Sequence, residues 1–278
     1  MARSHVEFIQ AQVLPWQRGV PGTAARDDVE AKVLSRDSES GACSLLVRYP
    51  AGWVRATPER LAADEEFLVL EGQLAINGRS YRPYGYLPAG YERRVAAAPG
   101  GAVILTFFEG APHARATGAC DTRKLIEHLD TDAMPWTPVI GIPNMRSGIA
   151  TRVLRVDPDN RERTWFLMAP PGGRTEGAVS PMEIHPVVEE MFVLSGVLVT
   201  ERGAMQPGAY FWRPPGEPHG PGGSRTGNLL FFRCKGGPLD VLWSEKTVAY
   251  SFEAGHNPIL PPELAALGAR PYRGALLY

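Results

Sequence analysis

Segments of the first half of this chain return in its second half at a nearly constant distance. Residues 65–72 read EEFLVLEG, and residues 189–196 read EEMFVLSG. Other paired segments also lie about 120 to 126 residues apart, a period that indicates a duplicated domain rather than a solenoid repeat. The chain has 278 residues, which is enough for two ordinary domains that each bury a core. We therefore expect two similar domains, over residues 1–120 and 121–278.

Glycine and proline are frequent, at 30 and 26 of 278 residues. Because the chain has no low-complexity repeats, these residues indicate many turns between short apolar segments, which is typical of all-β proteins. Residues 44–49 and 164–168 are rich in aromatic and branched side chains and predict strands. The expected fold class is therefore all-β.

Two short helices are expected within this pattern. In residues 121–129, three apolar side chains follow at i, i+1 and i+4, and Asp121 can cap the first turn. This segment predicts a short helix that links the two domains. Residues 262–267 begin with Pro-Glu and are followed by Gly268, which also predicts a helix.

Charge and cysteine content argue against several classes of protein. The net charge is −1, so no basic excess is available to bind a nucleic acid backbone. The three cysteines have no paired spacing and are expected to be reduced thiols. No apolar run approaches the roughly 18 residues of a membrane span, and residues 1–5 do not begin a signal peptide. We expect a cytoplasmic protein that binds neither nucleic acid nor a membrane.

Four side chains that can bind a metal ion are regularly spaced in the second half. One residue separates Glu183 from His185, three residues separate His185 from Glu189, and His219 follows a Pro-Gly turn. Side chains alternate between the two faces of a strand, so Glu183 and His185 are expected to point the same way. Imidazole nitrogens and carboxylate oxygens together suit a divalent metal ion.

This spacing resembles the two sequence motifs of the cupin superfamily. The first motif is G-x5-H-x-H-x3–4-E-x6-G, and the second is G-x5-P-x-G-x2-H-x3-N. Residues 177–196 and 208–223 keep every motif position except two, because Glu183 replaces the first histidine and Gly223 replaces the asparagine. The resemblance implies two tandem cupin barrels, each a double-stranded β-helix or jelly roll, joined by the short linking helix.

The resemblance also implies one divalent metal ion in the second barrel, with iron, manganese, zinc and nickel as candidates. Its ligands would be Glu183, His185, Glu189 and His219. An alternative role for Glu183 is that of a catalytic carboxylate that faces the cavity without touching the ion. Glu190 is expected to point outward into solvent by strand alternation.

The equivalent positions in the first half are Glu59, Leu61, Glu65 and Arg93. Leucine cannot bind a metal ion and no histidine remains, so this barrel is expected to be metal-free. Glu65 and Arg93 are expected to form an ion pair inside it. The alternative is a pocket in which Arg93 binds an anionic ligand.

Aromatic and cationic side chains near the second set of positions are candidates for contact with a substrate. These candidates are Trp165, Tyr210, Trp212, Phe231 and Arg174. Arg213 and Arg225 are further candidates for binding a carboxylate through two hydrogen bonds.

Cupins with this layout run several chemistries, and three functions stay open. The first is a metal-dependent enzyme that acts on a small organic acid or aromatic metabolite, with oxygenase chemistry of the dioxygenase type favoured. The second is a metal-dependent hydrolase or isomerase similar to ureidoglycine aminohydrolase, in which a Glu-x-His pair occurs at this place. The third is a non-catalytic sensor of a small molecule or metal, similar to cupins related to anti-sigma factors. Bicupins often dimerise at barrel edges, so a homodimer is expected.

Overall fold

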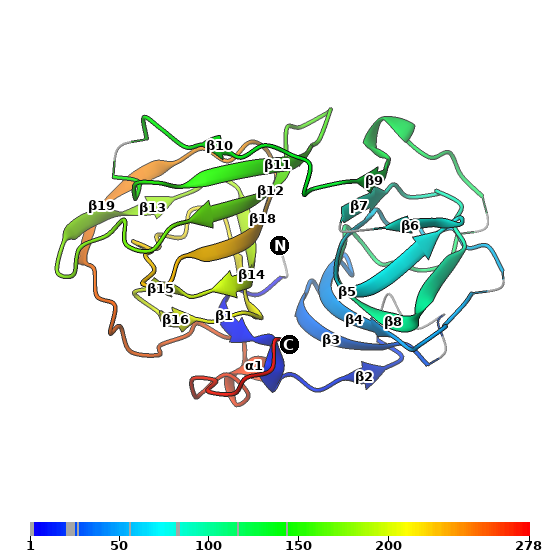
Figure 1. Cartoon of the computed structure of the whole chain (residues 1–278), viewed down its shortest axis with the longest axis horizontal. Helices are drawn as coiled ribbons and strands as arrows, with labels where there is room; N and C mark the ends of the chain where they lie inside the picture. Colours follow the sequence, from blue (N-terminus) through cyan, green and yellow to red (C-terminus); the bar gives the residue numbers. More distant parts are fainter. Residues whose placement is uncertain are drawn as a thin grey trace. The chain divides into compact units, whose positions relative to one another are not determined.

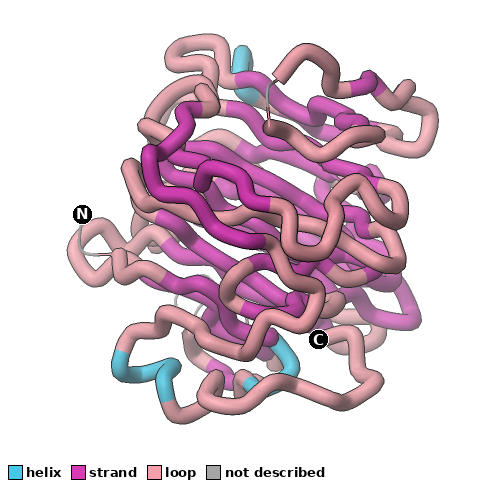
Figure 2. Tube along the Cα trace, turned by 90° about the vertical axis from the view of Figure 1, so that its left-hand side faces the viewer, coloured by secondary structure: helices cyan, strands magenta, loops and turns pink. Residues whose placement is uncertain are grey.

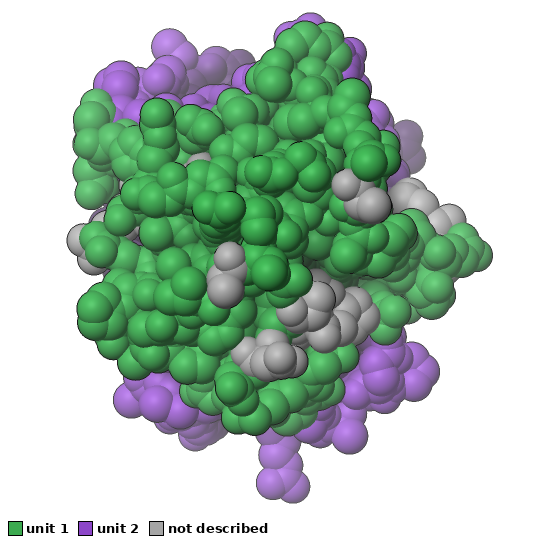
Figure 3. Space-filling view, turned by 90° about the vertical axis from the view of Figure 1, so that its right-hand side faces the viewer, with its two compact units in different colours: residues 1–4, 14–133 green, residues 5–13, 134–278 purple. Residues whose placement is uncertain are grey.

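The structure is a computed structural model that describes residues 3–20, 26, 28–55, 57–81, 84–115, 117–142 and 144–278. The chain divides into two compact units. The first consists of Met1–Ser4 and Leu14–Ala133, and the second of His5–Val13 and Met134–Tyr278 (Figure 3). Strands make up a large part of the described trace, loops connect them, and the helical segments are short (Figure 2). Among the described residues, no helix has the length and apolar character needed to span a membrane.

The first unit is built on one antiparallel sheet in the order β2-β3-β4-β8-β5-β7-β9, with β6 paired to β5 (Figure 1). Its elements are β2 (Gln17–Arg18), β3 (Glu30–Arg36), β4 (Cys43–Tyr49), β5 (Glu65–Ile76), β6 (Arg79–Tyr81), β7 (Tyr84–Leu87), β8 (Val95–Phe108), the 3-10 helix η2 (Thr122–Lys124) and β9 (Ile126–Leu129).

The second unit contains a larger sheet in the order β1-β17-β14-β18-β12-β11-β10 and two small sheets, β13-β19 and β15-β16. Its elements are β1 (Val6–Gln10), the 3-10 helix η1 (Ala11–Val13), β10 (Thr137–Pro138), β11 (Ala150–Val156), β12 (Arg163–Ala169), β13 (Val179–Ile184), β14 (Val188–Gly196), β15 (Leu198–Thr200), β16 (Gly203–Met205), β17 (Ala209–Arg213), β18 (Asn228–Lys235), β19 (Leu242–Ala249) and α1 (Pro262–Ala265).

The duplication seen in the sequence is present in the strand order. The run β3-β4-β8-β5-β7 in the first unit has its counterpart in β11-β12-β18-β14-β17 in the second. The irregularities also match, because the register shifts between Val33 and Ser35 in one unit and between Val153 and Arg155 in the other. Each unit is therefore the same arrangement of antiparallel strands, and the all-β fold class is confirmed.

The predicted linking helix over residues 121–129 is wrong except for one 3-10 turn. Asp121 does cap this turn, since its side chain accepts a hydrogen bond from the Arg123 backbone N–H at 3.1 Å. The following residues form β9, in which Ile126 and Leu129 pair with β7. Four residues with apolar ends fit a short strand as well as a helix, and the edge of β7 supplies the hydrogen-bond partners that favour the strand. The second predicted helix is present in shorter form as α1.

The two compact units do not divide at the predicted position after residue 120. They divide after Ala133, because β9 pairs with the sheet of the first unit. The second unit also includes β1, which pairs in antiparallel fashion with β17. The first described strand of the chain is therefore an edge strand of the later unit.

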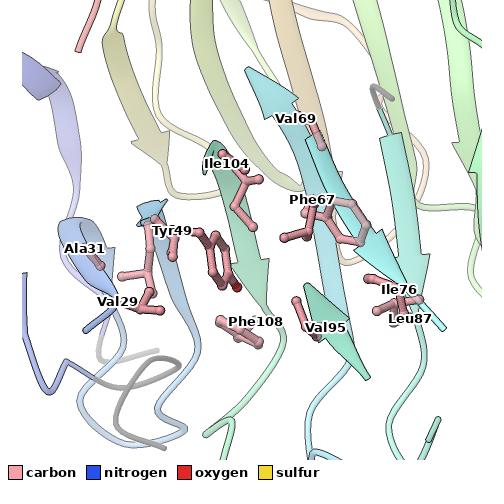
Figure 4. Close-up of a cluster of buried hydrophobic side chains, with 14 of the residues drawn as sticks. Val29, Ala31, Tyr49, Phe67, Val69, Ile76, Leu87, Val95, Ile104 and Phe108 are labelled. Carbon is pink, nitrogen blue, oxygen red and sulfur yellow. The ribbon is translucent and has the colours of Figure 1, made fainter. Parts of the chain in front are cut away.

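Apolar side chains at alternate positions form the core of each unit. In the first unit, Phe67 and Val69 of β5 lie beside Ile104 and Phe108 of the neighbouring strand β8 within one buried cluster (Figure 4). In the second unit, the cluster includes Trp165, Phe211 and Phe232, among others. These period-2 patterns are those expected of strands with one buried face.

Gly196 tests how closely the strands of the second unit approach each other. Its φ is +69°, and an added Cβ would lie 2.0 Å from the Gly227 carbonyl oxygen. The control is Gly177, which has a φ of +77° and open space around an added Cβ. Gly177→Ala should cost about 1 kcal/mol of unfolding free energy through backbone strain alone. Gly196→Ala should cost a further ~1–3 kcal/mol, because the backbone must shift. Equal urea midpoints for the two variants would contradict this packing.

Candidate functional site

The second unit contains a cavity of about 160 Å³ that opens to the surface. Its polar lining includes Glu183, His185, Glu189, Arg213 and His219. Most of the remaining wall is apolar and comes from strands and loops of the same unit. That wall includes Val139, Ile142, Ile149, Trp165, Leu167, Phe211, Leu230, Phe232, Leu239 and Val241. Carboxylates and imidazoles therefore meet in a largely apolar space.

A short backbone bridge positions two of the polar residues. The Glu183 N–H donates to the His219 carbonyl at 2.8 Å, and the His219 N–H donates to the Glu183 carbonyl at 3.0 Å. The Gly216 N–H donates to the His185 carbonyl at 2.8 Å. The Pro-Gly turn of the second motif is thus bonded directly to the Glu-x-His segment of the first.

Backbone carbonyls fix the tautomer of both histidines. His185 Nδ1 lies 2.8 Å from the Asp240 carbonyl oxygen, and His219 Nδ1 lies 3.1 Å from the Glu217 carbonyl oxygen. A carbonyl oxygen only accepts hydrogen bonds, so each Nδ1 carries the proton, and in the neutral ring the lone pair is on Nε2. Burial and the neighbouring charge of Arg213 lower the pKa of His219 to about 3, so this ring is neutral at physiological pH.

The Nε2 atoms of both rings face carboxylate oxygens. His185 Nε2 lies 3.6 Å from Glu189 Oε1, and His219 Nε2 lies 3.6 Å from Glu189 Oε2. Glu183, His185 and His219 each offer a ligand atom, and these three atoms lie within 4.8 Å of one another. A lone pair that faces a carboxylate oxygen is unfavourable unless a proton or cation lies between them.

The donor set fits a divalent metal ion. Two ligands that bind one ion at about 2.0–2.2 Å are at most about 4 Å apart, and both 3.6 Å separations lie within this limit. Two imidazoles and two carboxylates suit iron, manganese, zinc or nickel. Glu183, His185 and His219 could therefore hold such an ion, and Glu189 lies beside them with one carboxylate oxygen 3.6 Å from each imidazole Nε2.

The two carboxyl groups of the site have opposite pKa shifts. Burial, and then the charge of Glu189, raise the pKa of Glu183. Burial alone would raise the pKa of Glu189 as well, but His185 and Arg213 outweigh it and lower that pKa. Such a pair assigns different tasks to two neighbouring carboxyls. The ionised form of Glu189 is therefore favoured, whereas Glu183 holds a proton more readily than a free carboxyl group does.

Arg213 holds the Glu189 side chain in place and is itself held by Glu7. Arg213 Nη1 donates to Glu189 Oε2, while Arg213 Nε and Nη2 donate to the two oxygens of Glu7 at 2.7 and 2.5 Å. All three side chains are buried. Glu7 lies on β1. It was not among the predicted site residues, because no local sequence pattern connects it with Arg213, which lies 206 positions away.

The first unit has the same backbone bridge with different side chains. The Glu59 N–H donates to the Arg93 carbonyl at 2.8 Å, and the Arg93 N–H donates to the Glu59 carbonyl at 3.0 Å. Arg93 Nη1 forms the predicted ion pair with Glu65, and Arg26 Nη2 lies 2.7 Å from Glu59 Oε1. Guanidinium groups of the chain itself therefore neutralise the two carboxylates of this unit.

The prediction of which aromatic side chains line the cavity is correct on β12. On β17 and β18, the residue that lines the cavity is a sequence neighbour of the predicted one. Trp165 lines the cavity as expected. Tyr210 and Trp212 lie on the opposite face of β17, where Phe211 faces the cavity, and Phe231 lies on the opposite face of β18 from Phe232. Apolar side chains occupy both faces of these strands, so alternation alone could not select the inner one.

The prediction that Glu190 is solvated is also wrong. Glu190 is buried and accepts hydrogen bonds from Tyr210 Oη at 2.5 Å and from Arg233 Nη1 at 2.7 Å. It does point away from Glu189, as alternation requires, but that face of the strand is packed. An ion pair with Arg233 balances its charge.

The three candidate arginines have different surroundings. Arg174 lines the cavity, and its nitrogens donate to the Gly222 carbonyl, Ser180 Oγ and the Asn144 carbonyl at 3.1 to 3.2 Å. Arg213 lines the cavity but is held by two carboxylates. Arg225 is exposed and pairs with Glu253 at 2.6 Å.

The Glu7–Arg213 pair should make stability depend on pH. The Glu7 pKa is lowered from 4.5 to about 2, because Arg213 and His5 outweigh the opposing effect of burial. A lowered folded-state pKa gives stability that is present above about pH 4.5 and is lost as the pH falls toward 2. Glu7→Gln should therefore cost about 3–5 kcal/mol at pH 7 and flatten this acid limb. The control Glu253→Gln should change the unfolding free energy by less than about 1 kcal/mol, since that pair is exposed. Parallel pH profiles for Glu7→Gln and the parent would contradict the assignment.

Comparison with known proteins agrees with this architecture. Residues 126–238 match the family model described as the ChrR cupin-like domain. A crystal structure from Nostoc punctiforme, described as that of a "putative dioxygenase", is similar over 90% of this chain and 92% of its own, with a TM-score of 0.71 and 18% sequence identity. The protein YlbA from E. coli is similar over 82% of this chain and 89% of its own, with a TM-score of 0.54 and 12% identity. No curated protein matches the sequence. The chain therefore has an all-β cupin fold, and the match to the ChrR cupin-like domain runs from β9 of the first unit into the second unit.

Proposed function

We propose that this chain is a metal-dependent cupin enzyme with one divalent ion in its second unit, bound by His185, His219, Glu189 and Glu183. The observation that carries the proposal is the pair of histidines whose Nδ1 atoms are bonded to backbone carbonyls. Both Nε2 lone pairs consequently face carboxylate oxygens at the edge of a cavity. The matching strand order of the first unit supports a tandem arrangement of two cupin barrels, and within the described residues this donor set occurs in the second unit alone.

Each side chain has a distinct role in this proposal. His185 and His219 supply neutral nitrogen ligands, and the hydrogen bonds of their Nδ1 atoms orient the rings. Arg213 orients Glu189 and keeps it ionised. Glu183 is either the second carboxylate ligand, which a bound divalent ion would keep ionised, or a carboxyl group beside the ion. In the second case its pKa, raised by burial and by Glu189, suits it to take a proton from a bound substrate or return one. A bound divalent ion would supply Lewis acidity and, if it is iron or manganese, redox chemistry.

Oxygenase chemistry is the reaction class that the cavity favours. Its wall is largely apolar, with Trp165, Phe211 and Phe232 close to the polar cluster. An apolar wall accepts dioxygen and an organic substrate but offers few partners to orient a hydrolytic water. The similarity to the N. punctiforme protein described as a "putative dioxygenase" points in the same direction. We therefore infer an oxygenase that acts on a small organic molecule.

Metal binding is tested by His219→Ala, with His128→Ala as the control because His128 is an exposed histidine of β9. His219→Ala removes one nitrogen ligand and should reduce bound metal from about one ion per chain to near zero, whereas His128→Ala should retain it. Elemental analysis of purified protein gives the measurement, and circular dichroism shows whether the variants are folded. A folded His219→Ala protein with full metal content would refute the ligand assignment.

The reaction class is tested on metal-loaded protein with an oxygen electrode. Iron-loaded wild-type chain should consume dioxygen in the presence of small aromatic or keto acids, and Glu183→Gln should lower that rate at least about tenfold if Glu183 transfers the proton. Ammonia release from ureidoglycine without oxygen uptake would favour a hydrolase instead. Ligand binding without any turnover would favour a sensor.

A further inference from the structure

Arg146 is a buried cation whose hydrogen-bonding capacity is only partly used. It lies between β10 and β11, is 8% exposed and lines the cavity of the second unit. Its Nη2 donates to Asn228 Oδ1 at 3.3 Å, and its Nη1 has no hydrogen-bond partner. A buried donor without a partner is costly, so a group that accepts from Nη1 would be strongly favoured there.

The other two deeply placed arginines of the cavity are already engaged. Arg174 donates to two backbone carbonyls and to Ser180, and Arg213 donates to Glu7 and Glu189. Arg174 also bonds the Asn144 carbonyl, two residues before Arg146, and so helps to fix the segment that carries it. Arg163, the fourth arginine of the lining, also has a buried Nε without a hydrogen-bond partner, but its guanidinium group lies over the Trp165 ring at 4.7 Å. Arg146, whose unpartnered atom is the terminal nitrogen Nη1, is the better placed of the two to bind a ligand, while Arg174 positions it.

The charges around the cavity call for an anion. Burial and the nearby charge of Arg174 lower the pKa of Arg146 to about 10, so the guanidinium group stays charged at neutral pH. The lining contains four arginines and two glutamates, and one of these glutamates, Glu189, is already paired with Arg213. A buried charge without an equal partner is unfavourable, and an anionic ligand would balance it.

We propose that Arg146 binds the carboxylate of the substrate, with the apolar body of that molecule against Trp165, Phe211 and Phe232 and beside the two histidines. This inference rests on the proposed function and names its substrate class. The cavity volume of about 160 Å³ is close to that of an engineered apolar cavity of about 150 Å³ that admits benzene. A carboxylic acid with one aromatic ring therefore fits.

The probe is benzoate, compared with benzyl alcohol, which has a similar ring but no charge. Isothermal titration is performed on metal-free protein, so that no metal ion can bind the carboxylate. Wild-type protein should bind benzoate at least about tenfold more tightly than benzyl alcohol, because a charge-assisted bond to Nη1 is gained. Arg146→Met should remove this preference and leave the affinity for benzyl alcohol unchanged.

Two further variants separate the role of Arg146 from a general effect of charge. Arg225→Met removes an exposed arginine that pairs with Glu253 and should bind benzoate as wild type does. Arg163→Met removes the remaining arginine of the lining, which lies over the Trp165 ring at 4.7 Å, and should retain the preference for benzoate. A crystal structure of the benzoate complex should show a carboxylate oxygen within hydrogen-bond distance of Arg146 Nη1.

Several results would overturn the proposal. Equal affinity of wild-type protein for benzoate and benzyl alcohol would do so without any variant, even if Arg146→Met failed to fold. Loss of the preference in Arg163→Met but not in Arg146→Met would also do so. The metal content of the His219→Ala protein is independent of these titrations, so the carboxylate site and the metal site can fail separately.

Discussion

Buried carboxylates need positive charge beside them, and the two units of this chain meet that need differently. Glu59 and Glu65 in the first unit are neutralised by Arg26 and Arg93. In the second unit, Arg213 neutralises Glu189, but an imidazole stands where the first unit has Arg93. Because the backbone bridge is the same in both units, the side chains on it make the difference. In the first unit, arginines of the chain neutralise the carboxylates. In the second unit, the histidine lone pairs face a cavity.

The charged side chains of the second unit therefore form a connected series. Glu7 and Arg213 form an outer pair that is fully engaged, and Glu189 connects this pair to the histidines. The outer pair prevents the glutamate from turning away, and the backbone carbonyls of Asp240 and Glu217 do the same for the rings. The side chains that would bind a metal ion are consequently held in place by hydrogen bonds, and the unpartnered donor that we propose for a ligand lies at Arg146.

Local patterns in the sequence were sufficient for the fold class and for the positions of the polar cluster. The repeat of residues 65–72 at 189–196 corresponds to β5 and β14, and its register against β8 and β18 is the same in both units. The spacing of Glu183, His185 and His219 predicted a convergence that the backbone bridge produces. Features of this kind depend on neighbours within a few residues, or on a motif already known from other chains.

Other features depend on contacts that a local pattern does not encode. Period-2 alternation gives two faces, and with Tyr210, Phe211 and Trp212 all apolar it could not indicate which face lines the cavity. Residues 126–129 became a strand because the edge of β7 was free to pair with them. Glu7 and Arg146 gain their significance from partners more than 80 residues away. Such contacts follow from the packing of the complete unit.

The membership of β1 in the second unit also has a consequence for how the chain acquires its structure on the ribosome. Glu7 is synthesised 206 residues before Arg213. At about 5–20 residues per second, this strand waits about 10–40 s for β17 to emerge. During that interval, five side chains that are buried in the finished protein have no sheet to join. The nascent chain therefore carries this unpaired strand past the completion of the first unit, and a chaperone that shields the strand would have time to act.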